Sequence, residues 1–120
     1  MSNIRGIRGA ISVPKNTKDE IISSTMLLLR KMVNANKVKI EDIASIIFSV
    51  TKDLNAEFPA IAARRMKWLS TPLLCTYEVD VPGSVKHCIR ILMHVNSNKT
   101  QSSIKHVYLR NAKKLRPDLG

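Results

Sequence analysis

The spacing of hydrophobic residues divides the chain into segments that predict strands and helices. Apolar residues alternate with small or polar ones over residues 3–13, which predicts a strand with Arg8 on the face opposite Ile7 and Ile11. A nearly continuous apolar run over residues 43–50 predicts a central strand that is covered on both faces. Three further segments have strand-like composition, namely residues 72–79, 88–96 and 105–109.

Two segments have the pattern of helices. Apolar residues recur at helical spacing from Ile21 to Met32, so the first helix is expected to end near Asn34. Thr17 and Glu20 have the spacing of a capping box, in which each side chain accepts a hydrogen bond from the backbone N–H of the other residue. The second helix is expected over residues 58–68, where a proline in the first turn precedes good helix formers.

The connections between these segments complete the expected fold. A Pro-Gly pair in residues 80–84 predicts a turn, so residues 72–79 and 88–96 are expected to form a hairpin. With the hairpin centred at Ser84, Glu78 lies opposite Arg90. The element order predicts an α+β fold, with a mixed β-sheet and the helices packed on one of its faces.

The length of the chain limits the number of domains and functional sites that it can form. A chain of 120 residues is expected to form a single domain over residues 1–120, with one site or interface, and residues 111–120 are expected to be a basic and flexible tail. No apolar run approaches the ~18 residues of a membrane span. No secretory signal is recognised at the start, so a cytoplasmic location is expected.

The charge of the chain favours an anionic partner. Lys and Arg outnumber Asp and Glu by 20 to 9, which gives a net charge of +11, and residues 86–120 contain Asp118 as their one acidic residue. Such a field would attract nucleic acid, an acidic membrane face or a small polyanionic metabolite. Aromatic residues make up only 4% and are not interleaved with Lys or Arg, which weakens the nucleic-acid interpretation.

Motifs for metal, nucleotide or covalent chemistry are not recognised. Cys75 and Cys88 lack a CxxC spacing, so they are expected to be free thiols and by default small buried residues. The three histidines lack the spacing of metal ligands, and no glycine-rich phosphate loop or nucleophile elbow occurs. We therefore expect neither a metal nor a cofactor.

Arg90 is the residue that stands out, because it interrupts the apolar strand around Ile89 and Ile91. A buried charge is costly unless it is paired, and Glu78 is the obvious partner. Two interpretations remain open at this point: an ion pair that only satisfies both side chains, or a binding site.

Six short segments form a set that spans nearly the whole chain. The segments are Arg5-Gly-Ile-Arg8-Gly-Ala, Phe58-Pro-Ala with Ala63-Arg64, Pro72-Leu-Leu-Cys75 with Glu78, Cys88-Ile-Arg90, His106-Val-Tyr108-Leu and Leu115-Arg116-Pro-Asp-Leu. Together, and in this order, they resemble a known family, the small monofunctional chorismate mutases of the trimeric α/β (Bacillus) type.

The resemblance implies a barrel-like homotrimer with active sites between subunits. The implied reaction is the Claisen rearrangement of chorismate to prephenate, in the biosynthesis of phenylalanine and tyrosine, without a covalent intermediate or a cofactor. An enzyme of this kind has to restrain a flexible dianion and stabilise the charge separation of the transition state. The alternatives are a basic nucleic-acid-binding module and a trimeric protein that binds an anionic metabolite without converting it.

The resemblance also implies roles for individual residues. Arg90 would donate to the ether oxygen, and Glu78 would face the substrate ring and hold Arg90. Arg8 and Tyr108 would bind carboxylates, while Cys75 would lie near the ring hydroxyl. The remaining matches are pocket or entrance positions, namely Phe58, Ala60, Arg64, Leu73, Leu74, Leu115 and Arg116. Ile61 departs from the pattern, because many relatives carry Lys at this position.

Overall fold

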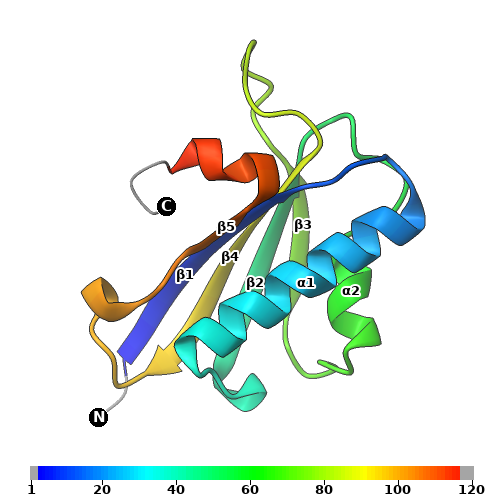
Figure 1. The fold of residues 1–120 in the computed structure, drawn as a ribbon. Coiled ribbons are helices and arrows are strands. Elements are labelled where there is room, and N and C mark those ends of the chain that lie inside the picture. Colours follow the sequence, from blue (N-terminus) through cyan, green and yellow to red (C-terminus); the bar gives the residue numbers. More distant parts are fainter. Residues whose placement is uncertain (1–2, 117–120) are drawn as a thin grey trace.

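A five-stranded mixed sheet forms the centre of the molecule, shown in Figure 1 as a computed structural model that describes residues 3–116. The strand order is β3-β2-β4-β1-β5. β4 runs antiparallel to both β1 and β2, whereas β3 and β5 run parallel to their neighbours. The strands are β1 (Asn3–Ser12), β2 (Ile43–Val50), β3 (Leu73–Tyr77), β4 (Cys88–Ser97) and β5 (Val107–Leu109).

Two α-helices lie on one face of this sheet, as Figure 1 shows. They are the long α1 (Lys18–Asn36) and the short α2 (Ala60–Arg65). Three 3₁₀ helices complete the fold, namely η1 (Ile40–Asp42), η2 (Gln101–Ser103) and η3 (Arg110–Leu115). The expected α+β class, with a mixed sheet and helices on one face, is confirmed.

The first helix begins where the capping signal places it. The Thr17 hydroxyl accepts a hydrogen bond from the Glu20 N–H over 3.2 Å. The Thr17 N–H bonds to the Lys15 carbonyl instead of the Glu20 carboxylate, so the reciprocal half of the expected capping box is not formed. The helix continues slightly past the expected end, to Asn36, and Lys37 closes it in a left-handed conformation at φ 51°.

The hydrophobic core fills the space between the helices and the sheet. β1 contributes Ile7 and Ile11, and α1 contributes Leu28 and Met32, all of them without solvent exposure. Phe48 from the central strand β2 is also fully buried. Burying this apolar surface is the main contribution to the stability of the fold.

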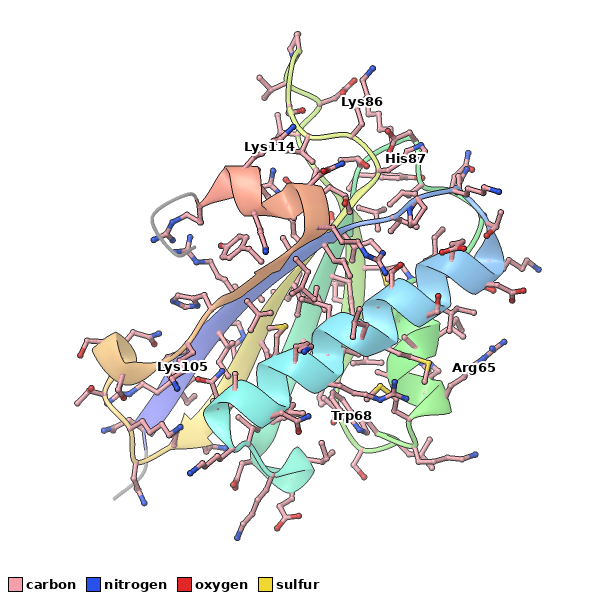
Figure 2. The ribbon with its side chains drawn as sticks, viewed as in Figure 1. Arg65, Trp68, Lys86, His87, Lys105 and Lys114 are labelled. Carbon is pink, nitrogen blue, oxygen red and sulfur yellow. The ribbon has the colours of Figure 1, made fainter. Side chains whose placement is uncertain are left out.

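The predicted hairpin between residues 72–79 and 88–96 is wrong. β2 lies between β3 and β4 and pairs with both of them, so Ser49 has Thr76 on one side and Arg90 on the other. The almost continuously apolar β2 is central in the sheet, as expected, with a strand on each side. The expectation that both of its faces are covered is wrong, because the α-helices cover one face and Ile47 and Ser49 on the other are only half-buried. The Pro-Gly turn belongs to a long loop, and Figure 2 shows Lys86 and His87 near its end, before β4.

The second helix is shorter than predicted. It ends at Arg65, and Lys67 adopts a left-handed backbone at φ 67° before the buried Trp68. A residue with this conformation cannot continue a right-handed helix. In the part of the chain that the structure describes, no helix has the length and apolar character of a membrane span.

Gly9 on β1 provides a stability test, because a Cβ atom there would lie 2.5 Å from the Met32 sulfur and 3.2 Å from Leu28. Met32 is fully buried and cannot swing into solvent. We predict that Gly9→Ala lowers the free energy of unfolding by about 1 to 3 kcal/mol through overpacking. Urea denaturation measures this change.

Gly6→Ala is the matched control on the same strand. Its added Cβ would meet Leu92 at 3.7 Å, which is an ordinary contact. Equal stability of the two variants would contradict the proposed close packing at Gly9.

Candidate active site

The face of the sheet opposite the helices carries a cavity of about 310 Å³. Gly9 faces α1, so strand alternation directs Arg8 to this open face. Neighbouring strands bring Glu78, Arg90 and Tyr108 to the same cavity. Its remaining lining residues are Gly9, Ile47, Ser49, Ile91, Leu92, Leu115 and Arg116.

Arg90 and Glu78 form an ion pair inside this cavity. Arg90 Nε lies 3.5 Å from Glu78 Oε1. Among residues 3–116, this Nε is a buried donor without a hydrogen-bond acceptor. This atom is buried and so is not open to a ligand, but the Arg90 side chain as a whole is 39% exposed, so its remaining guanidinium N–H groups can donate to a ligand oxygen.

Glu78 is held through both its side chain and its backbone. Ser49 of β2 donates a hydrogen bond to Glu78 Oε1, and the Glu78 N–H donates to the Val50 carbonyl over 2.9 Å. Glu78 therefore reaches Arg90 across β2 rather than from the adjacent strand of a hairpin. Sequence reasoning found the pair but missed Ser49. The signal that could have found it is its position as a polar residue in an otherwise apolar strand.

Tyr108 and the C-terminal segment close one side of the cavity. Tyr108 of β5 pairs with Ala10 of β1, and η3 continues from this strand. Residues 110–115 form η3, Ala112 is fully buried, and Leu115 and Arg116 line the cavity, while the flexibility expected of residues 111–120 stays a prediction. Residues 117–120 of the predicted tail lie outside the described residues.

The other predicted site residues lie elsewhere in the same chain. Phe58 and Cys75 line a second cavity, also of about 310 Å³, between β3 and the segment before α2. Leu73, Ala60 and Ile61 pack against the core, while Arg64 is exposed.

Leu74 points away from this second group. Strand alternation separates it from its neighbours Leu73 and Cys75, and 60% of its surface is exposed. A single chain therefore does not bring all the predicted residues into one pocket. Together with Phe58, which is 66% exposed, Leu74 leaves apolar surface open on the outside of the chain.

Cys75 is a free thiol in a partly buried position. Burial raises the pKa of this thiol, and a hydrogen bond with the Ala60 backbone offsets part of that effect. The thiol is therefore protonated at neutral pH and can act as a weak hydrogen-bond donor. No group of three His, Cys, Asp or Glu side chains converges as a metal site within residues 3–116.

His106 supports the backbone of Arg8 from the start of the last strand. Its Nδ1 accepts a hydrogen bond from the Arg8 N–H over 2.9 Å, in the position just before the β1–β5 pairing begins. Burial lowers the pKa of His106, and the positive charges of Arg8 and Arg116 lower it further. The imidazole is therefore neutral at pH 7, with its lone pair on Nδ1 available to Arg8.

This environment predicts a loss of stability in mild acid. Because the pKa of His106 is lower in the folded than in the unfolded chain, the unfolded chain binds more protons as the pH falls below about 6.5. The free energy of unfolding should decrease between pH 7.5 and pH 5.5. His106→Asn, which keeps an acceptor near the Nδ1 position but does not titrate, should lose less stability over this interval in urea denaturation. The same pH dependence in both proteins would contradict the assignment to His106.

Comparisons with known proteins show the family of this chain. The family model described as chorismate mutase type I matches residues 4–119. Chorismate mutase AroH from Bacillus subtilis is 45% identical over 98% of this chain and 93% of its own length. The Thermus thermophilus protein of the same name is 48% identical over 97% and 96%, respectively. A solved chorismate mutase from Clostridium thermocellum superposes with a TM-score of 0.90 at 57% identity, over 91% of this chain and 97% of that one. The chain therefore belongs to the family of type I chorismate mutases.

Proposed function

We propose that this chain is an isomerase that converts chorismate to prephenate for the biosynthesis of aromatic amino acids. Membership in the type I chorismate mutase family supports this activity. The observation that carries the proposal is the Arg90 guanidinium, which belongs to a cavity-lining side chain that is 39% exposed and lies beside the anchored carboxylate of Glu78. Such a donor is suited to an oxygen atom that becomes negative during the reaction.

The rearrangement breaks the ether C–O bond ahead of C–C bond formation, so negative charge develops on the ether oxygen and positive charge on the ring. Arg90 donates to the ether oxygen, and because its guanidinium is planar it also reaches a substrate carboxylate. Glu78 faces the ring, where its negative charge offsets the positive charge that develops. These charges are already in place before the reaction, so little reorganisation is needed at the transition state.

Restraint of the substrate conformation is the second contribution to catalysis. Chorismate is flexible and has to adopt a diaxial conformation before its reacting carbons meet. Arg8 and Tyr108 bind its carboxylates, and Leu115 and Arg116 close the same cavity. The net charge of +11 attracts the dianion to this surface.

The complete site is proposed to form between subunits of a barrel-like homotrimer. The two groups of predicted residues line separate cavities in one chain, so a neighbouring copy is needed to bring Phe58, Leu74 and Cys75 against Arg90. Exposed apolar residues such as Val79 supply surface that assembly would bury. This burial has to outweigh the repulsion between three basic chains. The two free thiols are compatible with the cytoplasm as the location.

The role of Arg90 predicts a large loss of activity on substitution. Arg90→Ala should raise the reaction barrier by about 3 to 4 kcal/mol, because one donor to the transition state is removed. The activity of Arg90→Lys should lie between those of the unaltered enzyme and Arg90→Ala, since lysine keeps the charge but not the planar fork. The disappearance of chorismate absorbance after adding enzyme alone measures each rate.

Arg65→Ala is the charge-matched control for Arg90→Ala. Figure 2 shows Arg65 on α2, where its side chain projects away from the sheet, and it lines neither cavity. It should keep normal activity. If folded Arg90→Ala protein retained most of its activity, the mechanism above would be refuted.

The shared site predicts complementation between two impaired variants. Arg90→Ala damages the first cavity, and Phe58→Asp places a negative charge in the second, where it repels the dianion. Mixed trimers refolded from both chains contain some sites in which neither change occurs, so activity should exceed that of either variant alone. Sedimentation equilibrium of the unaltered protein should report three chains. A monomer, or no recovery of activity in the mixture, would contradict the shared site.

A further inference from the structure

The C-terminal 3₁₀ segment η3 is attached to β1 and α1 by a polar contact outside the cavity. Arg110 Nη1 donates hydrogen bonds to the Ser12 carbonyl and to the Ser24 hydroxyl, each over 2.9 Å. The backbone N–H of Asn111 donates to the Ser12 hydroxyl over 3.1 Å. These bonds join residues that are far apart in the sequence, at the end of β1, in the second turn of α1 and at the start of η3.

Both residues that accept these hydrogen bonds are buried, so the contact does not lie on the solvent-exposed surface. Ser24 is 1% exposed and Ser12 is 8% exposed, so water has little access to either side chain. Hydrogen bonds from a charged donor to buried acceptors are stronger than those between neutral groups. Removing the guanidinium would leave the Ser24 hydroxyl without this donor.

The backbone of Arg110 also depends on these contacts. Its φ of 56° lies in the left-handed region, which a long side chain rarely adopts. This conformation turns the chain from β5 into η3, which begins at Arg110 itself. Surrounding contacts have to hold such a conformation in place, and the bonds to Ser12 and Ser24 do so.

The segment that Arg110 attaches carries residues of the cavity. Ala112 is fully buried in a small cluster with Ala10 and Cys88, and Leu115 packs against this cluster. Leu115 and Arg116 then line the cavity that contains Arg90. Arg110 itself does not line the cavity, so any effect it has on substrate passes through this segment.

We infer that Arg110 is a positioning residue for the active site: by bonding to Ser12 and Ser24, it holds η3 so that Leu115 and Arg116 close the cavity over the substrate. This inference rests on the proposed function of the cavity. Closure of a site in this way affects substrate binding more than the chemical step, because neither closing residue donates to the ether oxygen.

The test compares Arg110→Ala with Lys114→Ala. Figure 2 shows Lys114 on the same segment, and it is exposed and does not line the cavity, so both variants remove one positive charge from η3. We expect Arg110→Ala to raise KM for chorismate about tenfold, with kcat changed about twofold at most. Lys114→Ala should leave both constants within about twofold of the unaltered enzyme.

Two further variants separate positioning from general stability. Arg110→Lys should raise KM less than Arg110→Ala does, because an ammonium group can still donate to one of the two acceptors. Ser24→Ala removes one acceptor without changing the charge, so it should also raise KM, but less than Arg110→Ala does. Hydrogen exchange of the amides of residues 112–116 should become faster in Arg110→Ala and stay unchanged in Lys114→Ala.

The outcomes are distinct. If Arg110→Ala and Lys114→Ala have the same KM while Arg90→Ala is inactive, the inference is overturned and the proposed function stands. Faster exchange of η3 without a rise in KM also overturns it, because the segment would then be attached by Arg110 without serving the site. If Arg90→Ala remains fully active, the proposed function itself fails.

Discussion

The cavity depends on one electrostatic constraint, which is that a guanidinium and a carboxylate meet on the open face of the sheet while β2 lies between their strands. Glu78 follows β3 and Arg90 lies within β4, yet the two side chains approach to 3.5 Å. Ser49 and the Val50 carbonyl hold Glu78 from the intervening strand. This arrangement keeps two opposite charges oriented in a partly buried place, where electrostatic interactions are stronger than in water.

One face of the sheet forms the hydrophobic core, and the other face carries the candidate active site. Close packing of α1 against Gly9 and Ile11 buries the helix-covered face and leaves little room there for a ligand. The other face keeps Arg8 exposed and Arg90 partly exposed, beside the small residue Ala10, which pairs with Arg90. Because strand residues alternate between faces, the same strands can supply a tight core on one side and a charged cavity on the other.

The edges of the cavity come from segments outside the central strands. His106 precedes β5 and supports the Arg8 backbone, and η3 follows β5 and brings Leu115 to the cavity. The second group of predicted residues, which includes Phe58 and Cys75, lies around another cavity. The chain thus presents two partial pockets, and a complementary surface from another copy would join them into one.

The sequence by itself determined the elements, the fold class and the family. Local spacing is enough for the elements and the fold class, because hydrophobic periodicity and the Thr17 cap depend on residues that are near each other in the chain. The family was indicated by the resemblance of six short segments to its members. The sequence also identified Arg90 and Glu78 as a pair, since a charge in an apolar strand requires a partner. Only the tertiary structure decided that β2 lies between them, that Ser49 holds Glu78 and that residues 110–115 form η3. Strand order and the Arg110 contacts with Ser12 and Ser24 join residues far apart in the sequence, and competing long-range pairings cannot be ranked from local patterns.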